Sequence, residues 1–150
     1  KILRQADAEG LVLQPSNSKE IVNICCCCGD CCQILLNLKR QAVPAAAVSS
    51  PFVAALDTEA CSGCEICVDR CQMEAIEMVD DHAVLTVDRC IGCGLCVSTC
   101  PEDALSLERK PAAAQPAIPG NQQEAFAMRS RARAAAKADI EGKVERHRKA

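Results

Sequence analysis

Apolar and polar positions in the middle of the chain form short segments typical of strands. Phe52–Leu56 is an apolar run of strand length, and 104–107 is a second one. Between them, Ile76–Val79 and 83–87 flank the polar residues 80–82, which is the pattern of a hairpin. The pattern therefore predicts a small antiparallel sheet.

Helical periodicity flanks this region on both sides. Residues 1–10 are expected to end a helix at Gly10, and 33–41 to form a helix whose apolar stripe includes Leu35. Residues 111–120 have the Pro/Ala composition of a linker, and 121–150 have the composition of a helix or a solvated tail.

A cysteine repeat dominates the loops of the predicted sheet. Two runs of the form C-x2-C-x2-C-x3-C lie 29 positions apart. The matched pairs are Cys61/Cys90, Cys64/Cys93, Cys67/Cys96 and Cys71/Cys100. An internal repeat that carries ligands predicts two similar sites.

The spacing distinguishes between the chemistries that cysteines support. Three thiolates within seven residues suit the irons on one side of a cubane, and a fourth on the following short helix points toward the other cluster. Zinc prefers two separated C-x2-C pairs around one tetrahedral ion, and a disulfide framework suits small secreted domains. The runs therefore favour [4Fe-4S] clusters over zinc or disulfides.

Residues 52–110 resemble a bacterial-type dicluster ferredoxin domain, on the strength of these eight cysteines. The resemblance implies that Cys61, Cys64, Cys67 and Cys100 bind one [4Fe-4S] cluster. It implies that Cys90, Cys93, Cys96 and Cys71 bind the other. The second run ends in Cys100-Pro101 as in that family, whereas the first ends in Cys71-Gln72. This departure keeps the ligands but changes the local backbone.

Residues between the ligands predict unequal reduction potentials. Backbone N–H groups near a cluster raise its potential, and the second loop has two glycines, Gly92 and Gly94, that allow such an approach. Glu65 in the first loop disfavours reduction by its negative charge. We therefore expect the cluster of the first loop to have the lower potential.

A second cysteine-rich segment precedes the sheet. Six of the eight positions 25–32 are cysteine, and Cys25, Cys28 and Cys31 repeat the C-x2-C-x2-C spacing. We predict a third [4Fe-4S] cluster here, with Cys32 or an outside cysteine as fourth ligand. Zinc, a redox dithiol and plain packing of small apolar side chains stay open as alternatives. The segment also resembles the cysteine-rich stretch before the dicluster domain in longer bacterial ferredoxin-like proteins.

The predicted fold class is α+β: a ferredoxin-like pseudo-twofold repeat with a small antiparallel sheet. The expected divisions are 1–51, a helical segment with the cysteine-rich motif; 52–110, the dicluster domain; 111–120, a linker; and 121–150, a basic helical or disordered tail. Residues 1–110 carry 9 Lys/Arg and 16 Asp/Glu, whereas 111–150 carry 8 and 4. The charge asymmetry indicates two different surfaces for partners.

Electron transfer is the expected function, since no catalytic triad, phosphate-binding loop or pair of catalytic carboxylates is recognisable in the sequence. The alternatives are the iron–sulfur subunit or C-terminal fragment of a larger oxidoreductase, and a redox-sensing or structural iron–sulfur protein. The expected partners are redox proteins or an oxidoreductase complex, with no nucleic acid and no transmembrane segment. Thiolate-rich chemistry favours the cytoplasm.

Overall fold

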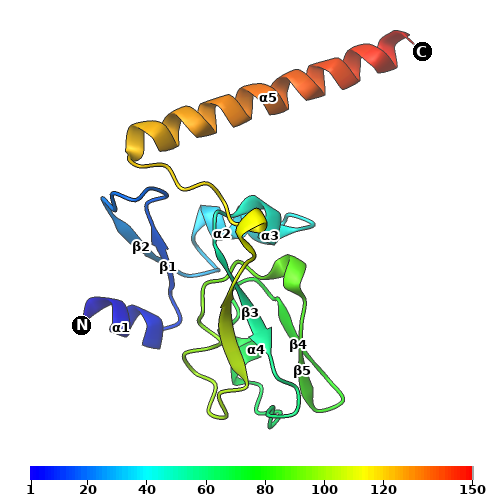
Figure 1. Cartoon of the computed structure of the whole chain (residues 1–150). Helices are drawn as coiled ribbons and strands as arrows, with labels where there is room; N and C mark the ends of the chain where they lie inside the picture. Colours follow the sequence, from blue (N-terminus) through cyan, green and yellow to red (C-terminus); the bar gives the residue numbers. More distant parts are fainter. Residues whose placement is uncertain (150) are drawn as a thin grey trace. The chain divides into compact units, whose positions relative to one another are not determined.

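The computed structural model describes residues 1–149, and the side chains of all of these except 136 and 139–149. The chain divides into two compact units (Figure 1). One comprises Lys1–Pro15 and Ile24–Ala117, and the other Ser16–Asn23 and Ile118–Ala150. The cysteines all belong to the first unit.

Two antiparallel strand pairs organise the first unit. Strand β3 (Phe52–Leu56) pairs with β6 (Leu105–Arg109), so the two ends of the predicted domain lie side by side. Strands β4 (Ile76–Val79) and β5 (His82–Leu85) form the predicted hairpin. The pattern of apolar positions thus predicted the strands, although they form separate two-stranded sheets and not one.

The two strand pairs have matching registers. Leu56 lies opposite Leu105, and Leu85, 29 positions after Leu56, lies opposite Ile76, 29 positions before Leu105. The adjoining backbone hydrogen bonds match as well: Asp57 N–H donates to Ala104 O and Thr86 N–H to Ala75 O, both at 2.8 Å. Each pair therefore joins one strand from each half of the cysteine repeat.

The two cysteine loops differ in the elements that adjoin them. The first leads into helix α4 (Ile66–Arg70), and Cys71 lies directly after the end of this helix. The second comes after a 3₁₀ turn, η1 (Val87–Arg89), and continues into the hydrogen-bonded turn 95–99. We expected a second helix there, but residues 95–99 form a turn, although Val97 N–H and Ser98 N–H donate to Gly94 O just as Val68 N–H and Asp69 N–H donate to Glu65 O in the first loop.

The N-terminal part of this unit is less helical than predicted. Helix α1 (Ile2–Ala8) ends two residues before Gly10, which has φ +79° and terminates the helix as expected. The cysteine-rich segment begins as strand β2 (Ile24–Cys27), antiparallel to β1 (Val12–Pro15). The expectation of a helical segment was wrong for this stretch, because the apolar run before it supplies a partner strand.

Two short helices connect this hairpin to β3. Helix α2 (Gln33–Lys39) confirms the predicted helix, and its Leu35 is fully buried. Pro44 begins a further helix, α3 (Pro44–Ala47). Proline suits the first turn because its missing N–H has no partner there.

The core lies between the strand pairs and the cysteine loops. Its buried side chains are small or aliphatic and include three cysteines: Leu35, Ala54, Cys67, Met73, Ala75, Ile76, Ala83, Cys90, Leu95, Cys96 and Leu105. The aromatic core of an ordinary domain of this size is replaced by sulfur and short side chains.

The second unit contains helix α5 (Gln122–Lys149) and the loop Ser16–Asn23. Backbone bonds join the loop to the start of this region, from Lys19 N–H to Pro119 O at 2.9 Å and from Glu20 N–H to Gly120 O at 3.1 Å. Helix α5 confirms the helical expectation for the tail. A short 3₁₀ turn, η2 (Ala112–Ala114), lies in the preceding linker. None of the helices in the described part of the chain is long and apolar enough to cross a membrane.

Candidate iron–sulfur centres

Two pockets lie in the first unit, and each is bordered by four cysteines. The first is bordered by Cys61, Cys64, Cys67 and Cys100. The second is bordered by Cys71, Cys90, Cys93 and Cys96. Their empty volumes, including open solvent at the mouth, are similar at about 350 and 370 Å³. Each pocket thus gathers three cysteines from one run and the last cysteine of the other.

The walls between the cysteines are mainly apolar, although Glu65 and Glu102 also line the first pocket. Leu56, Met78 and Leu105 line the first pocket, and Met73, Ile76 and Leu95 line the second. Apolar walls exclude water, which strengthens electrostatic interactions between thiolates and whatever they bind. The sites are therefore thiol-rich cavities with few other polar groups.

The cysteines of each pocket influence one another's charge. Burial raises the pKa of the Cys67 thiol, and the charges of the pocket's other three cysteines raise it further. Burial likewise raises the pKa of Cys96 to about 12, again with the other three cysteines of its pocket as the next causes. Four thiolates facing one apolar space repel each other unless a cation compensates them, so the donor set fits a metal cluster with thiolate ligands.

Backbone N–H groups contact the sulfur atoms of the second pocket. Ala54 N–H donates to Cys90 Sγ at 3.4 Å, and Ala75 N–H donates to Cys71 Sγ at 3.2 Å. Such bonds favour the more negative, reduced cluster and raise its potential. Both bonds go to sulfur atoms of the second pocket. They therefore favour a higher reduction potential there than in the first pocket, which is the order that the sequence predicts.

The backbone around the ligands also repeats at 29 positions. Gly63 and Gly92 have φ +72° and +66°, and Glu74 and Asp103 have φ +53° and +50°. Glu65 has φ +64°, a conformation that its counterpart Gly94 adopts without a side-chain penalty. The loop shape is thus common to both halves although the residues differ.

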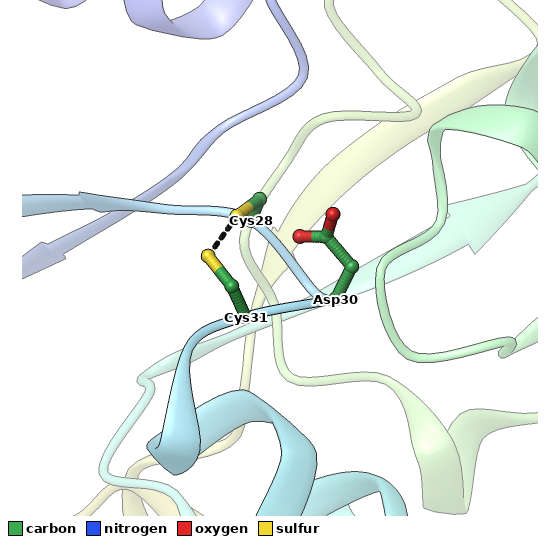
Figure 2. A group of neighbouring side chains, drawn as sticks. All are labelled: Cys28, Asp30 and Cys31. Carbon is green, nitrogen blue, oxygen red and sulfur yellow. Dashed lines mark hydrogen bonds between the residues drawn. The ribbon is translucent and has the colours of Figure 1, made fainter.

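Four of the six thiols of the cysteine-rich segment lie in two pairs. Cys28 Sγ and Cys31 Sγ are 2.7 Å apart, and Asp30 lies beside them, with all three ligand atoms within 4.8 Å of one another (Figure 2). Burial and then a hydrogen bond to Cys32 raise the pKa of Cys27 to about 11. Cys25 and Cys32 are not part of the group around Asp30 in the described structure.

These positions bear on the predicted third cluster without testing it. Of its four expected ligands, the structure brings Cys28 and Cys31 together and gives Cys32 a different thiol neighbour. The third cluster with Cys25, Cys28, Cys31 and Cys32 therefore stays a prediction.

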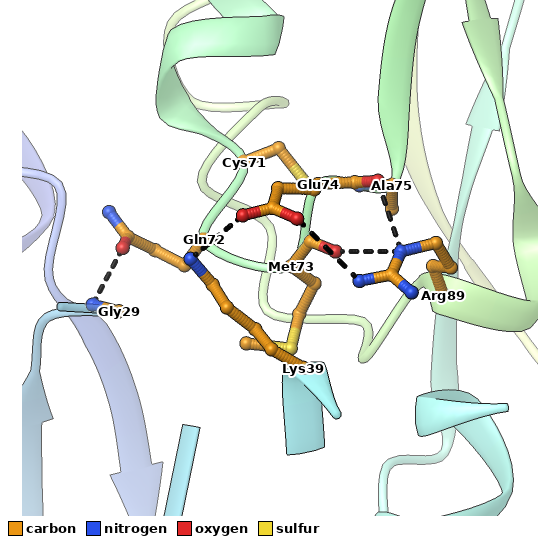
Figure 3. Close-up of polar contacts among 8 residues, drawn as sticks. All are labelled: Gly29, Lys39, Cys71, Gln72, Met73, Glu74, Ala75 and Arg89. Atoms are coloured by element: carbon orange, nitrogen blue, oxygen red, sulfur yellow. Dashed lines mark hydrogen bonds and ion pairs between the residues drawn. The ribbon is translucent and has the colours of Figure 1, made fainter. Parts of the chain in front are cut away.

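Gln72 connects this segment to the second pocket. Its Oε1 accepts a hydrogen bond from Gly29 N–H at 2.7 Å (Figure 3), and its Nε2 donates to Gly10 O at 3.0 Å. Gln72 directly follows Cys71 and occupies the position that Pro101 has in the second run. The departure from proline is visible in the sequence, but the partners of the glutamine side chain are not.

Two arginines make further contacts in this region. Arg70 binds the end of helix α1, and Arg89 binds the turn that follows Cys71. Arg70 donates to the carbonyl oxygens of Asp7 and Ala8 at the end of α1. Arg89 Nε donates to Met73 O at 3.0 Å and to Glu74 O at 3.1 Å (Figure 3). No sequence signal indicates these contacts, because isolated arginines are common on any surface.

Comparison with known families agrees with this geometry. Residues 60–105, about a third of the chain, match the family model described as a 4Fe-4S dicluster domain. No curated protein matches the chain. All eight cysteines of the two pockets lie within the matched residues, so this part of the chain is similar to a 4Fe-4S dicluster domain.

Proposed function

We propose that the chain is an electron carrier that holds two [4Fe-4S] clusters, one in each four-cysteine pocket. The dicluster domain implies iron–sulfur electron transfer. The observation that supports two clusters is the set of cysteines around each pocket. Each pocket has three cysteines of one run and the last cysteine of the other run, Cys100 in the first pocket and Cys71 in the second. Two cavities of similar volume fit two copies of the same cofactor.

We infer that the domain is a pseudo-twofold repeat. Support comes from the registers of the two strand pairs and from positive φ values that recur at 29 positions. A repeat of this kind explains why the fourth ligand of each pocket comes from the other half. A twofold rotation that exchanges the two halves of the domain would also exchange Cys71 and Cys100.

A short covalent connection joins the two proposed clusters. Cys67 lies in α4 and borders the first pocket, whereas Cys71 follows that helix and borders the second. Cys96 and Cys100 make the reverse connection. The clusters supply one-electron redox chemistry when bound, and these two four-residue links hold the ligand sulfurs of both pockets in a fixed relation.

The other residues around the pockets set the reduction potential of each proposed cluster. The apolar walls exclude water, and the N–H groups of Ala54 and Ala75 stabilise added negative charge at the second pocket. Glu65 borders the first pocket and opposes added electrons there. We infer that an electron is held preferentially at the second pocket.

The context of the carrier is proposed at a coarser level. The chain serves a redox system, either as a free ferredoxin-like module in the cytoplasm or as the electron-transfer part of a larger oxidoreductase. A redox-sensing role is the other candidate class. These differ in one observable, because a carrier exchanges electrons rapidly with a redox partner while a sensor changes activity only when its cluster is lost.

The test is the metal content of anaerobically purified protein, combined with low-temperature electron paramagnetic resonance after reduction. We expect about eight iron and eight acid-labile sulfide per chain, with two interacting spin systems. About twelve iron would add the predicted third cluster at the cysteine-rich segment. Zinc in place of iron would refute the assignment of both pockets.

A further inference from the structure

The Cys28–Cys31 pair is a chemical group that the dicluster domain does not use. The two residues flank Gly29 and Asp30 in the turn between β2 and α2, and their sulfur atoms are 2.7 Å apart (Figure 2). Cys31 is exposed and Cys28 is partly exposed, so solvent and other proteins reach the pair. A C-x-x-C turn with accessible sulfur is a common form of redox-active dithiol.

The arrangement differs from that of the cluster pockets. A cubane needs its ligand sulfurs spread around a cavity, one for each iron, as the cysteines of the two pockets are. Here two sulfurs contact each other directly, and Cys32 shares a hydrogen bond with Cys27 instead of joining them. Sulfur atoms at this separation need only a small movement to form an S–S bond, whose length is about 2.0 Å.

The pair is attached to the second pocket through one side chain. Gly29, between the two cysteines, donates its N–H to Gln72 Oε1 at 2.7 Å, and Gln72 is bonded to Cys71 (Figure 3). Gly29 allows this contact because a Cβ there would overlap with Gln72 Oε1 and lie 3.1 Å from Gln72 O. A path of covalent bonds and one hydrogen bond thus runs from Cys28 to a bordering cysteine of the second pocket.

We propose that Cys28 and Cys31 form a thiol–disulfide couple that exchanges electrons with the cluster bound by Cys71, through Gln72. The proposal rests on the two-cluster function above. In the reductive direction the Cys28–Cys31 S–S bond breaks, and the disulfide takes up two electrons and two protons to give two thiols. Each of the two clusters gives up one electron and is reduced again by an external one-electron donor. The protons come from water.

The number of electrons makes the combination useful. Each cluster carries one electron, and a disulfide requires two, so the loaded domain holds the number that one disulfide consumes. Ferredoxin-type clusters are more strongly reducing than most protein dithiols, which sets the direction from cluster to disulfide. The exposed dithiol then passes two electrons to a partner's disulfide by thiol–disulfide exchange. The class of acceptor is therefore a protein or small-molecule disulfide.

The experiment compares electron uptake by the full chain and two paired variants. Cluster-loaded protein is treated with oxidised glutathione, freed of the reagent, and titrated anaerobically with a reduced viologen dye. The Cys28→Ser/Cys31→Ser variant removes the proposed couple. The Cys27→Ser/Cys32→Ser variant is the matched control, because it removes the neighbouring thiol pair from the same segment.

We expect about four electron equivalents for the native chain and for the control, and about two for the Cys28→Ser/Cys31→Ser variant. Differential alkylation with peptide mass spectrometry should find the disulfide between residues 28 and 31 before titration and two thiols after it. Equal uptake by the native chain and the Cys28→Ser/Cys31→Ser variant would overturn the proposal. So would a disulfide at 27 and 32, or iron or zinc bound at the segment.

A third variant tests the path. Gln72→Leu keeps a branched side chain, one bond shorter, but removes the hydrogen bonds to Gly29 and Gly10. We expect the same total uptake, full iron content and at least tenfold slower reduction of the disulfide by reduced clusters. An unchanged rate would show that Gln72 does not connect the sites. Iron content and cluster spectra are read on every variant, so failure of the clusters themselves is recognised separately from failure of the couple.

Discussion

Gly92→Ala is the substitution that tests most directly how the backbone holds a cluster loop. Gly92 has φ +66°, and a Cβ there would overlap with the carbonyl oxygen of Phe52 in β3 and lie 2.7 Å from Ser50 Oγ. The left-handed conformation costs a residue with a side chain about 1–2 kcal/mol. Overlap with a fixed backbone adds the cost of a strained core, about 1–3 kcal/mol.

The sum, about 2–5 kcal/mol, is a large share of the total stability of about 5–15 kcal/mol expected for a natural domain. It corresponds to a fall of roughly 30-fold to several thousand-fold in the folding equilibrium constant. Because Gly92 lies between Cys90 and Cys93, we expect the strain to appear first as loss of iron from the second pocket.

Chemical denaturation under anaerobic conditions, followed by the visible absorbance of the clusters, measures this effect. Gly63→Ala is the matched variant in the other half, since Gly63 has φ +72° and a Cβ there would overlap with Asp81 O. It should release iron from the first pocket. Gly120→Ala is the control, because the nearest atom to its Cβ is the flexible end of Glu124 at 3.2 Å. If Gly92→Ala had the same midpoint and iron content as Gly120→Ala, the derivation from loop geometry would be refuted.

Three further predictions concern individual residues of the two pockets. Cys71→Ser should alter the electron paramagnetic resonance signal of the cluster bound by the second run, although Cys71 belongs to the first run; a change confined to the first-run cluster would contradict the exchange of ligands. Glu65→Gln should raise the potential of the first-pocket cluster by less than about 60 mV in a redox titration, since this exposed charge is screened by solvent; an unchanged or lower potential would count against a role for Glu65. In the metal-free chain, burial raises the pKa of Cys96 from 9.0 to about 12. The contribution of this buried thiol to the free energy of unfolding is therefore present below pH 9 and is lost as the pH rises toward 12. Thermal melts across this range should show a falling midpoint, and a flat profile would contradict the buried thiol.

Much of the dicluster domain was predictable because its constraints are local in the sequence. Phe52–Leu56 and Ile76–Val79 are strands with the predicted bounds, since short apolar runs between turn residues leave few alternatives. The grouping of cysteines followed from ligand spacing and from the family resemblance. The missing second helix did not follow, because the two loops carry nearly the same pattern and even make matching backbone hydrogen bonds, to Glu65 O in the first and to Gly94 O in the second.

The N-terminal segment was less predictable because its structure depends on distant partners. Ile24–Cys27 is a strand only because Val12–Pro15 pairs with it, and no periodicity in a run of cysteines indicates this. The pairing of Cys28 with Cys31, and of Cys27 with Cys32, depends in the same way on how β2 turns into α2. Sequence spacing gives the candidates for a site, and the turn decides which of them meet.

The two halves of the repeat differ at a few positions, and these differences indicate unequal roles for the two pockets. Gln72 replaces the proline found at position 101, and its side chain makes two hydrogen bonds that proline has no atoms to make. Proline would fix φ at this position without any side-chain hydrogen bond, whereas the glutamine side chain is held by its bonds to Gly10 and Gly29. Gln72 therefore attaches the cysteine-rich turn to the turn that follows Cys71. If each pocket holds a cluster, as we propose, a symmetric pair would have no preferred exit for electrons, whereas this attachment lies on the second pocket's side of the described structure and would give the proposed carrier a direction.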